Sequence, residues 1–103
     1  MVDNVRLSER GLRVLHFLIQ QPTAHRSGAD IAKATGVGSG TLYPLLARLE
    51  AAGWLSSQWE KVEPSEAGRP RRRLYVLTGV GQRRVRESLS GLQIKAGAVA
   101  WAT

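Results

Sequence analysis

Apolar residues recur at helical spacing in four stretches of the chain, and this pattern predicts four helices. The first stretch, SERGLRVLHFLIQQ at residues 8–21, has Ser8 as an N-cap and Pro22 as its stop. Its apolar positions are Leu12, Leu15, Leu18 and Ile19. Their spacing puts them on one side of the helix, which we expect to face the core.

The second stretch, SGADIAKATG at residues 27–36, begins and ends with residues typical of helix termini. Ser27 and Asp30 fit the capping-box pattern, in which each side chain satisfies a backbone N–H of the other residue. Ile31 and Ala32 are expected to face inward, and Gly36 suits the left-handed position after a helix. The GVGSG segment that follows predicts a short turn into the next helix.

The third stretch, GTLYPLLARLEAAGWL at residues 40–55, has two very different sides. One side carries a leucine stripe, which consists of Leu42, Leu45, Leu46 and Leu49. The other side is small and nearly uncharged, and it consists of Thr41, Pro44, Ala47, Arg48 and Ala51. Either Ser39 or Thr41 is expected to cap this helix, and Gly53 to end it.

Two strands are predicted after the third helix. WLSSQWE at residues 54–60 and RRRLYVLT at residues 71–78 are rich in residues that favour strands, and the second alternates between two faces. The segment between them, KVEPSEAGRP, is too long for a tight hairpin turn and predicts a mobile loop.

The fourth helix occupies residues 79–103, with Thr78 as its cap. Its apolar residues follow a heptad spacing over about two and a half repeats, and they are Val85, Leu89, Leu92, Ala96 and Val99. This seam either folds back onto its own domain or pairs with a second copy of the chain. Glycines at positions 81, 91 and 97 would weaken an isolated helix by about 1 kcal/mol each, so packing must hold it.

Charge is concentrated in one block. Residues 69–86 contain seven arginines and no acid, whereas the rest of the chain balances at eight basic and eight acidic residues. A net charge of +7 placed in this way is typical of a polyanion-binding surface, although a solvated basic face would have the same composition.

Several classes of function are disfavoured. The chain has no cysteine, and its two histidines, His16 and His25, are joined by no acidic cluster, so no metal site or cofactor is expected. No Ser-His-acid arrangement or carboxylate pair indicates an enzyme. No segment has the length and apolarity of a membrane span or the apolar core of a signal peptide, so we expect a cytoplasmic protein that does not contact membranes.

The element order, two helices with a glycine turn followed by two strands and a helix, fits a winged helix-turn-helix. The segments GTLYPLLARLEAAGWL, SSQW and GRPRRRLYVLTGVG resemble the PadR-like transcriptional regulators over roughly residues 8–90. The residues that carry the resemblance are Tyr43, Arg48, Leu49, Glu50, Trp59, Arg72, Arg73, Tyr75, Leu77, Thr78 and Gly81. Ala29 departs from the family pattern, which has an aromatic residue there, so winged-helix repressors of the MarR type remain an alternative.

The resemblance implies a mainly α protein with a small β-hairpin. Residues 1–78 would form the DNA-binding domain, with the wing at about 54–78, and residues 79–103 a helix that forms a homodimer through Val85, Leu89, Leu92, Ala96 and Val99. Such a dimer would bind a palindromic double-stranded operator, usually as a repressor, and release it when a small-molecule effector binds.

Residues on two elements are candidates for DNA contacts. The third helix would enter the major groove, and its candidates are Ser39, Thr41, Tyr43, Pro44 and Arg48. The wing would follow the phosphate backbone or the minor groove with Arg69, Arg71, Arg72 and Arg73. Arg48 could instead pair with Glu50 or Glu60. A protein-interaction module that uses the smooth side of the third helix is the alternative function. Trp54, Trp59 and Tyr75 are expected in the core or on the strand faces rather than as platforms for bases.

Overall fold

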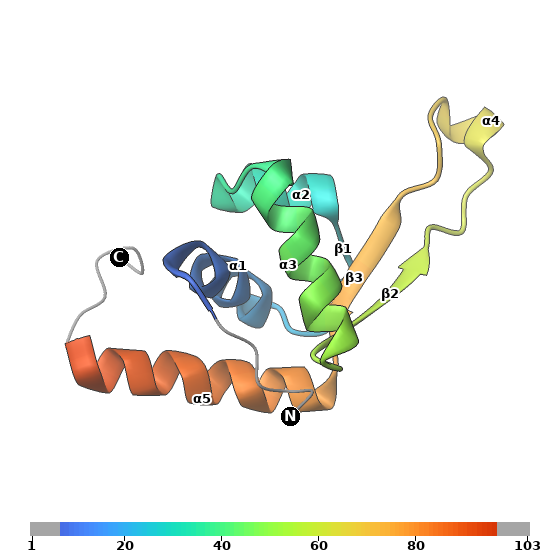
Figure 1. Cartoon of the computed structure of the whole chain (residues 1–103). Helices are drawn as coiled ribbons and strands as arrows, with labels where there is room; N and C mark the ends of the chain where they lie inside the picture. The colour runs from blue at the N-terminus through green and yellow to red at the C-terminus, as the bar shows by residue number, and fades with distance from the viewer. Residues whose placement is uncertain (1–6, 97–103) are drawn as a thin grey trace.

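A computed structural model of the chain describes residues 7–96, with side chains described for residues 7–90. The elements along the chain are α1 (Glu9–Gln20), β1 (Arg26–Ser27), α2 (Gly28–Thr35), α3 (Ser39–Ala51), β2 (Leu55–Trp59), α4 (Pro64–Ala67), β3 (Arg73–Leu77) and α5 (Gly79–Ala96). The β2–β3 hairpin projects away from the helices with α4 at its tip, and α5 runs along α1 on the opposite side of the domain (Figure 1).

Local capping explains where α1 and α2 begin and where α2 ends. Of the reciprocal capping box predicted at Ser27 and Asp30, only the bond accepted by Ser27 forms within the described residues. The Ser8 hydroxyl accepts a hydrogen bond from the Gly11 amide at 3.1 Å, and the Ser27 hydroxyl accepts one from the Asp30 amide at 3.1 Å. Each bond satisfies a backbone N–H that the helix itself leaves unpaired. Gly36 ends α2 in the left-handed conformation with φ 74°, so the chain can turn at once into α3.

The predicted cap of α3 is wrong. The helix starts at Ser39 with Gly38 as its N-cap, and neither the Ser39 nor the Thr41 side chain makes a capping hydrogen bond. Pro44 therefore lies inside the helix, where it has no N–H to donate to the carbonyl of Gly40. The far end agrees with the sequence, because Gly53 follows the helix with φ 83°.

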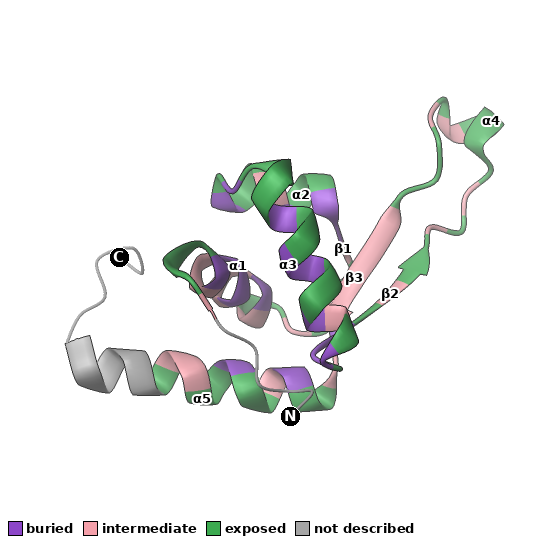
Figure 2. Ribbon diagram, in the orientation of Figure 1, coloured by how far each residue is buried: buried purple, intermediate pink, exposed green. Residues whose placement is uncertain are grey.

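The core forms where α1, α2 and α3 meet the base of the hairpin. The leucine stripe of α3 is almost fully buried, and Figure 2 shows these positions as purple bands on a helix whose other side is green. The other core residues are Val14, Leu15, Leu18, Ile31, Val37, Ala52, Trp54, Leu55, Leu77 and Val85.

The sheet has three antiparallel strands in the order β1-β3-β2, and the sequence predicted two of them. The sequence did not predict β1, which pairs with Leu74 and Tyr75 of β3. This strand has only two residues, so it is too short to show an alternating pattern. The predicted loop 61–70 also contains a helical turn, α4, closed by a hydrogen bond from the Gly68 amide to the Pro64 carbonyl at 2.9 Å.

The first half of α5 folds back onto its own domain. The Thr78 hydroxyl caps the helix by accepting a hydrogen bond from the Gly81 amide at 2.9 Å, as predicted. Val85 is completely buried in the core, and Leu89 is half-buried against it. Val85 is therefore removed from the predicted dimer interface, because its own chain covers it. The side chains of Leu92 and Ala96, and the whole of Val99, lie outside the described residues.

No helix within residues 7–96 is long and apolar enough to cross a membrane.

Gly81 allows α5 to pack closely against the segment that joins α3 to β2. A Cβ at position 81 would collide with the carbonyl oxygen of Trp54, which also accepts a hydrogen bond from the Thr78 amide at 3.0 Å. Gly81→Ala should lower the free energy of unfolding by about 2 kcal/mol or more, since backbone must move. Gly79→Ala is the matched control, because a Cβ there meets nothing within 4 Å; it should leave stability unchanged or raise it slightly. Urea denaturation measures both, and equal stabilities for the two variants would contradict the close contact.

Candidate nucleic-acid interface

The side of α3 opposite the leucine stripe is open to solvent. The predicted contact residues Ser39, Thr41, Tyr43, Pro44 and Arg48 are all exposed, as are Ala47 and Ala51. No element of the described chain covers this face (Figure 2). It therefore presents a smooth surface of small side chains with one long cationic group.

Arg48 is that cationic group. The acids that could have held it have other partners: Glu50 accepts a hydrogen bond from Ser57 at 2.6 Å, and Glu60 is bound to Arg69. Within the described residues the Arg48 guanidinium forms no hydrogen bond or ion pair. The structural pairing considered from the sequence is therefore absent, and Arg48 faces solvent.

Tyr43 connects α3 to the start of α2. Its side chain is 46% exposed, but its ring lies so close to Gly28 that a Cβ there would collide with it. Beside the ring lies a hollow of about 130 Å³. Its lining contains no acid and consists of Ser27, Gly28, Ala29, Tyr43, Arg72, Arg73 and Tyr75.

The face of the hairpin that includes Leu55 and Leu77 changes from apolar to charged along its length. These two residues pair in the buried core, Ser57 pairs with Tyr75 in the middle, and Trp59 pairs with Arg73 farthest out. Paired residues of an antiparallel ladder share a face, so the polar pairs continue outward from the core.

Glu50 and Trp59 hold Arg73 at the outer end of this face. The Arg73 guanidinium lies 5.1 Å from the centre of the Trp59 ring, and one of its nitrogens lies 3.9 Å from a carboxylate oxygen of Glu50. Because the same carboxylate accepts the Ser57 hydrogen bond, it ties the end of α3 to both strands. Trp54 lies in the core, and Trp59 and Tyr75 lie on the strands, although Trp59 is 58% exposed.

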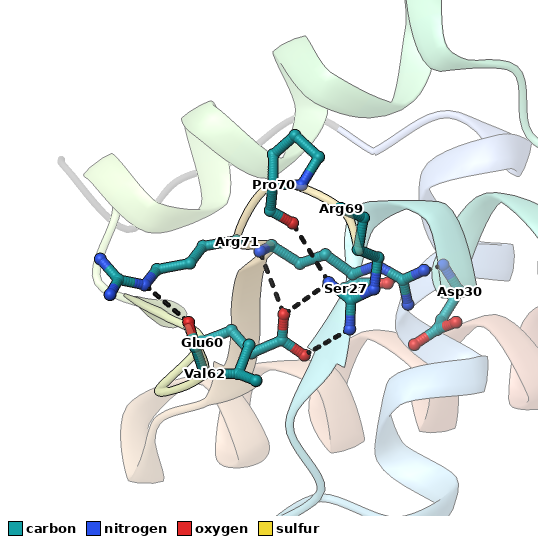
Figure 3. A network of polar contacts seen from close by, with 8 residues as sticks. Ser27, Asp30, Glu60, Val62, Arg69, Pro70 and Arg71 are labelled. Atoms are coloured by element: carbon teal, nitrogen blue, oxygen red, sulfur yellow. Dashed lines mark hydrogen bonds and ion pairs between the residues drawn. The ribbon is translucent and has the colours of Figure 1, made fainter. Parts of the chain in front are cut away.

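Two further wing arginines, Arg69 and Arg71, are held by different partners (Figure 3). Arg69 binds both carboxylate oxygens of Glu60, at 2.7 and 3.1 Å. Arg71 is exposed, and it donates to the carbonyl of Val62 at 2.8 Å and pairs loosely with Glu63 at 3.2 Å.

Arg72 is exposed, and its guanidinium has no hydrogen-bond or ion-pair partner within the described residues. From the sequence all four arginines are candidate DNA contacts, but strand alternation cannot point all of them outward, so only those that face solvent are expected to reach the DNA. In the fold, Arg72 and Arg71 face outward, Arg73 is stacked on Trp59, and Arg69 is engaged within the wing.

Within the described residues, no group of three or more histidine, aspartate or glutamate side chains could hold a metal ion. The exposed side chains of α3 and the wing present cationic and hydroxyl donors next to a smooth helix face. This arrangement suits contact with phosphates and with base edges.

The family model for "Transcriptional regulator PadR-like family" matches residues 14–87. This chain is a member of the PadR-like family. The prediction from the sequence is confirmed, and so is its winged helix-turn-helix fold. The family consists of transcriptional regulators rather than enzymes, and its members bind DNA.

Solved structures agree with this assignment. A PadR-like transcription factor from Bacteroides fragilis is 27% identical, with a TM-score of 0.65 over 82% of each chain. A PadR family regulator from Eggerthella lenta is 25% identical, with a TM-score of 0.68 over 85% of this chain and 79% of that one.

The adhesin competence repressor AdcR from Streptococcus pyogenes, at 17% identity and a TM-score of 0.66, covers 91% of this chain and 62% of its own. That likeness shows the fold alone. No curated protein sequence matches the chain.

Tyr75 should report the environment of the hollow through its ionisation. Burial raises the pKa of the Tyr75 phenol, and the nearby Glu50 carboxylate raises it further, against a smaller opposing effect of Arg73. Because the folded state favours the neutral phenol, the stability that Tyr75 contributes is present below its ordinary pKa of about 10. It is lost as the pH rises through the raised folded pKa.

The measurement uses tyrosinate absorbance. The chain has two tyrosines, so Tyr43→Phe leaves Tyr75 as the sole signal. Its midpoint should lie above that of a free tyrosine, and adding Glu50→Gln should lower it. A midpoint at the ordinary value, unmoved by Glu50→Gln, would rule out this environment.

Proposed function

We propose that this PadR-like protein is a homodimeric repressor that binds a palindromic DNA operator through α3 and the wing. The observation that carries the proposal is the open face of α3 beside an exposed wing arginine, Arg72. A helix with a fully buried stripe and an uncovered, small-residue face has the shape that a groove requires.

The two elements would have different roles in binding. The B-DNA major groove is about 12 Å wide, and Ala47 and Ala51 would allow the α3 backbone to approach the base edges. Thr41 and Ser39 lie in the first turn, where the helix dipole favours phosphate contacts. Arg48 would reach a phosphate or a guanine. Arg71 and Arg72 would neutralise backbone phosphates, so the wing would supply affinity and α3 most of the sequence preference.

Dimerisation would use the part of α5 beyond Leu89. Since Val85 and Leu89 pack against their own domain, the remaining heptad residues are Leu92, Ala96 and Val99. A two-fold axis through this helix would present two copies of α3 to half-sites about one helical turn apart, or a multiple of it. A small molecule bound near the dimer interface would change that spacing and release the operator.

The direct test selects bound fragments from a random duplex pool and then measures affinity against salt. Affinity should fall steeply as salt rises, because several phosphates are neutralised. Arg72→Ala should weaken binding to all sequences and reduce the salt slope by about 1, whereas Arg48→Ala should also alter sequence preference if it reads a base. Arg10→Ala removes an exposed charge from α1 and serves as the control.

The competing function is a protein-interaction module. The combined replacement of Arg71, Arg72 and Arg73 by alanine should abolish duplex binding but preserve an apolar contact made by α3. If the affinity for the duplex does not change with salt, DNA recognition of this kind is excluded. The same holds if the triple replacement leaves that affinity unchanged.

A separate prediction concerns the oligomer. Leu92→Asp should convert the dimer to a monomer and reduce operator affinity, since a charge would be buried in an apolar seam. Ser90→Asp is the control, because position 90 lies on the opposite side of α5 at 100° per residue and is exposed within its own chain. Sedimentation equilibrium measures both variants, and a Leu92→Asp protein that remains dimeric would place the interface elsewhere.

A further inference from the structure

Glu60 is an acid placed inside the basic wing, and both its carboxylate and its amide form hydrogen bonds within the wing. Its two carboxylate oxygens accept hydrogen bonds from the Arg69 guanidinium at 2.7 and 3.1 Å, and one of them also accepts the Arg72 amide at 3.3 Å. Its own amide donates to the Arg72 carbonyl at 2.8 Å. One residue at the end of β2 thus binds both the side chain and the backbone of the strand that returns from the tip (Figure 3).

We propose that Glu60 is the positioning residue of the wing, and that removing its negative charge weakens DNA binding instead of strengthening it. This inference rests on the proposed function. It also reassigns Arg69, which the sequence treated as a DNA contact, to the role of partner for Glu60.

The hydrogen bonds that join Glu60 to the Arg69 side chain and to the Arg72 backbone form a clamp, and its position explains its importance. The β2–β3 ladder ends at the Trp59–Arg73 pair, and residues 61–68 form an excursion beyond it that includes α4. The Glu60–Arg69 pair closes this excursion at its base. Arg71 and Arg72 follow Arg69 closely along the chain, between the clamp and β3. The Arg71 side chain also donates a hydrogen bond to the carbonyl of Val62, which lies on the β2 side of the loop. The directions of both outward arginines therefore depend on the closed loop.

Two effects of losing the Glu60 charge oppose each other. A negative charge near DNA repels phosphates, so its removal by itself would raise affinity. Removal also leaves the Arg69 guanidinium without its partner, which adds to the attraction. Opening the loop, however, would add the entropic cost of ordering Arg71 and Arg72 to each binding event. We expect this loss of order to outweigh the gain in charge, because the two arginines must be immobilised before they can contact phosphates.

The ionisation of Glu60 supports a clamp that stays formed at neutral pH. The hydrogen bond from Arg69 lowers the pKa of the Glu60 carboxyl below its ordinary value, although burial acts in the opposite direction. The stabilisation is therefore present above the ordinary pKa and is lost as the pH falls through the lowered one.

The chain offers a matched control. Glu66 lies in α4 of the same wing and is exposed, and its carboxylate has no hydrogen-bond or ion-pair partner within the described residues. Glu66→Gln removes the same charge from the same wing and leaves the clamp intact. Glu63→Gln would be less clean, because Glu63 pairs with Arg71.

The experiment compares Glu60→Gln, Glu66→Gln, Arg69→Gln and the Glu60→Gln/Arg69→Gln double variant in full-length protein bound to a selected duplex. We expect Glu60→Gln and Arg69→Gln each to weaken binding by about fivefold, the scale of one exposed ion pair. The double variant should be no weaker than either single variant. Glu66→Gln should bind as tightly as the original protein or more tightly.

Amide hydrogen exchange separates positioning from general destabilisation. In Glu60→Gln the Arg72 and Gly68 amides should exchange faster, while amides of α1 and α3 should keep their protection. The charge-exchanged variant, Glu60→Arg with Arg69→Glu, should restore affinity and the protection of the Gly68 amide, but not that of the Arg72 amide, because an arginine side chain has no hydrogen-bond acceptor.

The possible results distinguish this inference from the proposed function. If the original protein binds no duplex, the proposed function fails, and hydrogen exchange still tests the clamp. If the original protein binds DNA but Glu60→Gln binds as tightly as Glu66→Gln, the inference fails alone. Additive losses in the double variant would also overturn it, because they would show that Arg69 contacts DNA directly.

Discussion

Burial of the leucine stripe of α3 is the constraint on which the rest of the structure depends. Leu42, Leu45, Leu46 and Leu49 are each between 0% and 3% exposed. Each buried leucine contributes about 1.5–3 kcal/mol, so rotating the stripe into water would cost an amount comparable to the whole net stability of a small domain, about 5–15 kcal/mol. The rotation of α3 about its axis is therefore fixed, and the opposite, small-residue face is the one that solvent or a partner meets.

A continuous set of polar contacts carries this orientation from α3 into the wing. Glu50 at the end of α3 binds Ser57 of β2 and lies beside Arg73 of β3, which stacks on Trp59. Glu60 and Arg69 close the loop immediately beyond. These contacts fix the position of the wing arginines relative to the exposed face of α3. The proposed binding to two features of a duplex requires such a fixed arrangement.

The arginine block shows why charge counted along a chain is an incomplete guide to a binding surface. Its charges are alike in sequence, but Arg69 is half-buried on Glu60, whereas Arg72 is exposed. The acids that separate these roles lie outside the block: Glu60 reaches it through the pairing of the strands, and Glu50 reaches it from the end of α3, which packs against β2. The basic surface is therefore smaller than the composition indicates, and the acids within it are part of its construction.

The sequence by itself determined the features that depend on neighbours along the chain. These are the Ser8 and Ser27 caps, the left-handed Gly36 and Gly53, the leucine stripe, and the family to which the chain belongs. Hydrogen bonds and spacing within a few residues fix the caps, the turns and the stripe, and the family is recognised from short motifs along the chain. All of these can therefore be read from a single sequence.

Tertiary structure decided the features that depend on residues distant in sequence. It added β1, buried Val85 in its own core, required glycine at position 81 beneath Trp54, and divided the arginines between partners and solvent. Each of these depends on which segments come together, and several compatible pairings share the same periodicity and charge. Only the packed fold specifies which atoms meet, because contact energies depend on distances in space rather than on separation along the chain.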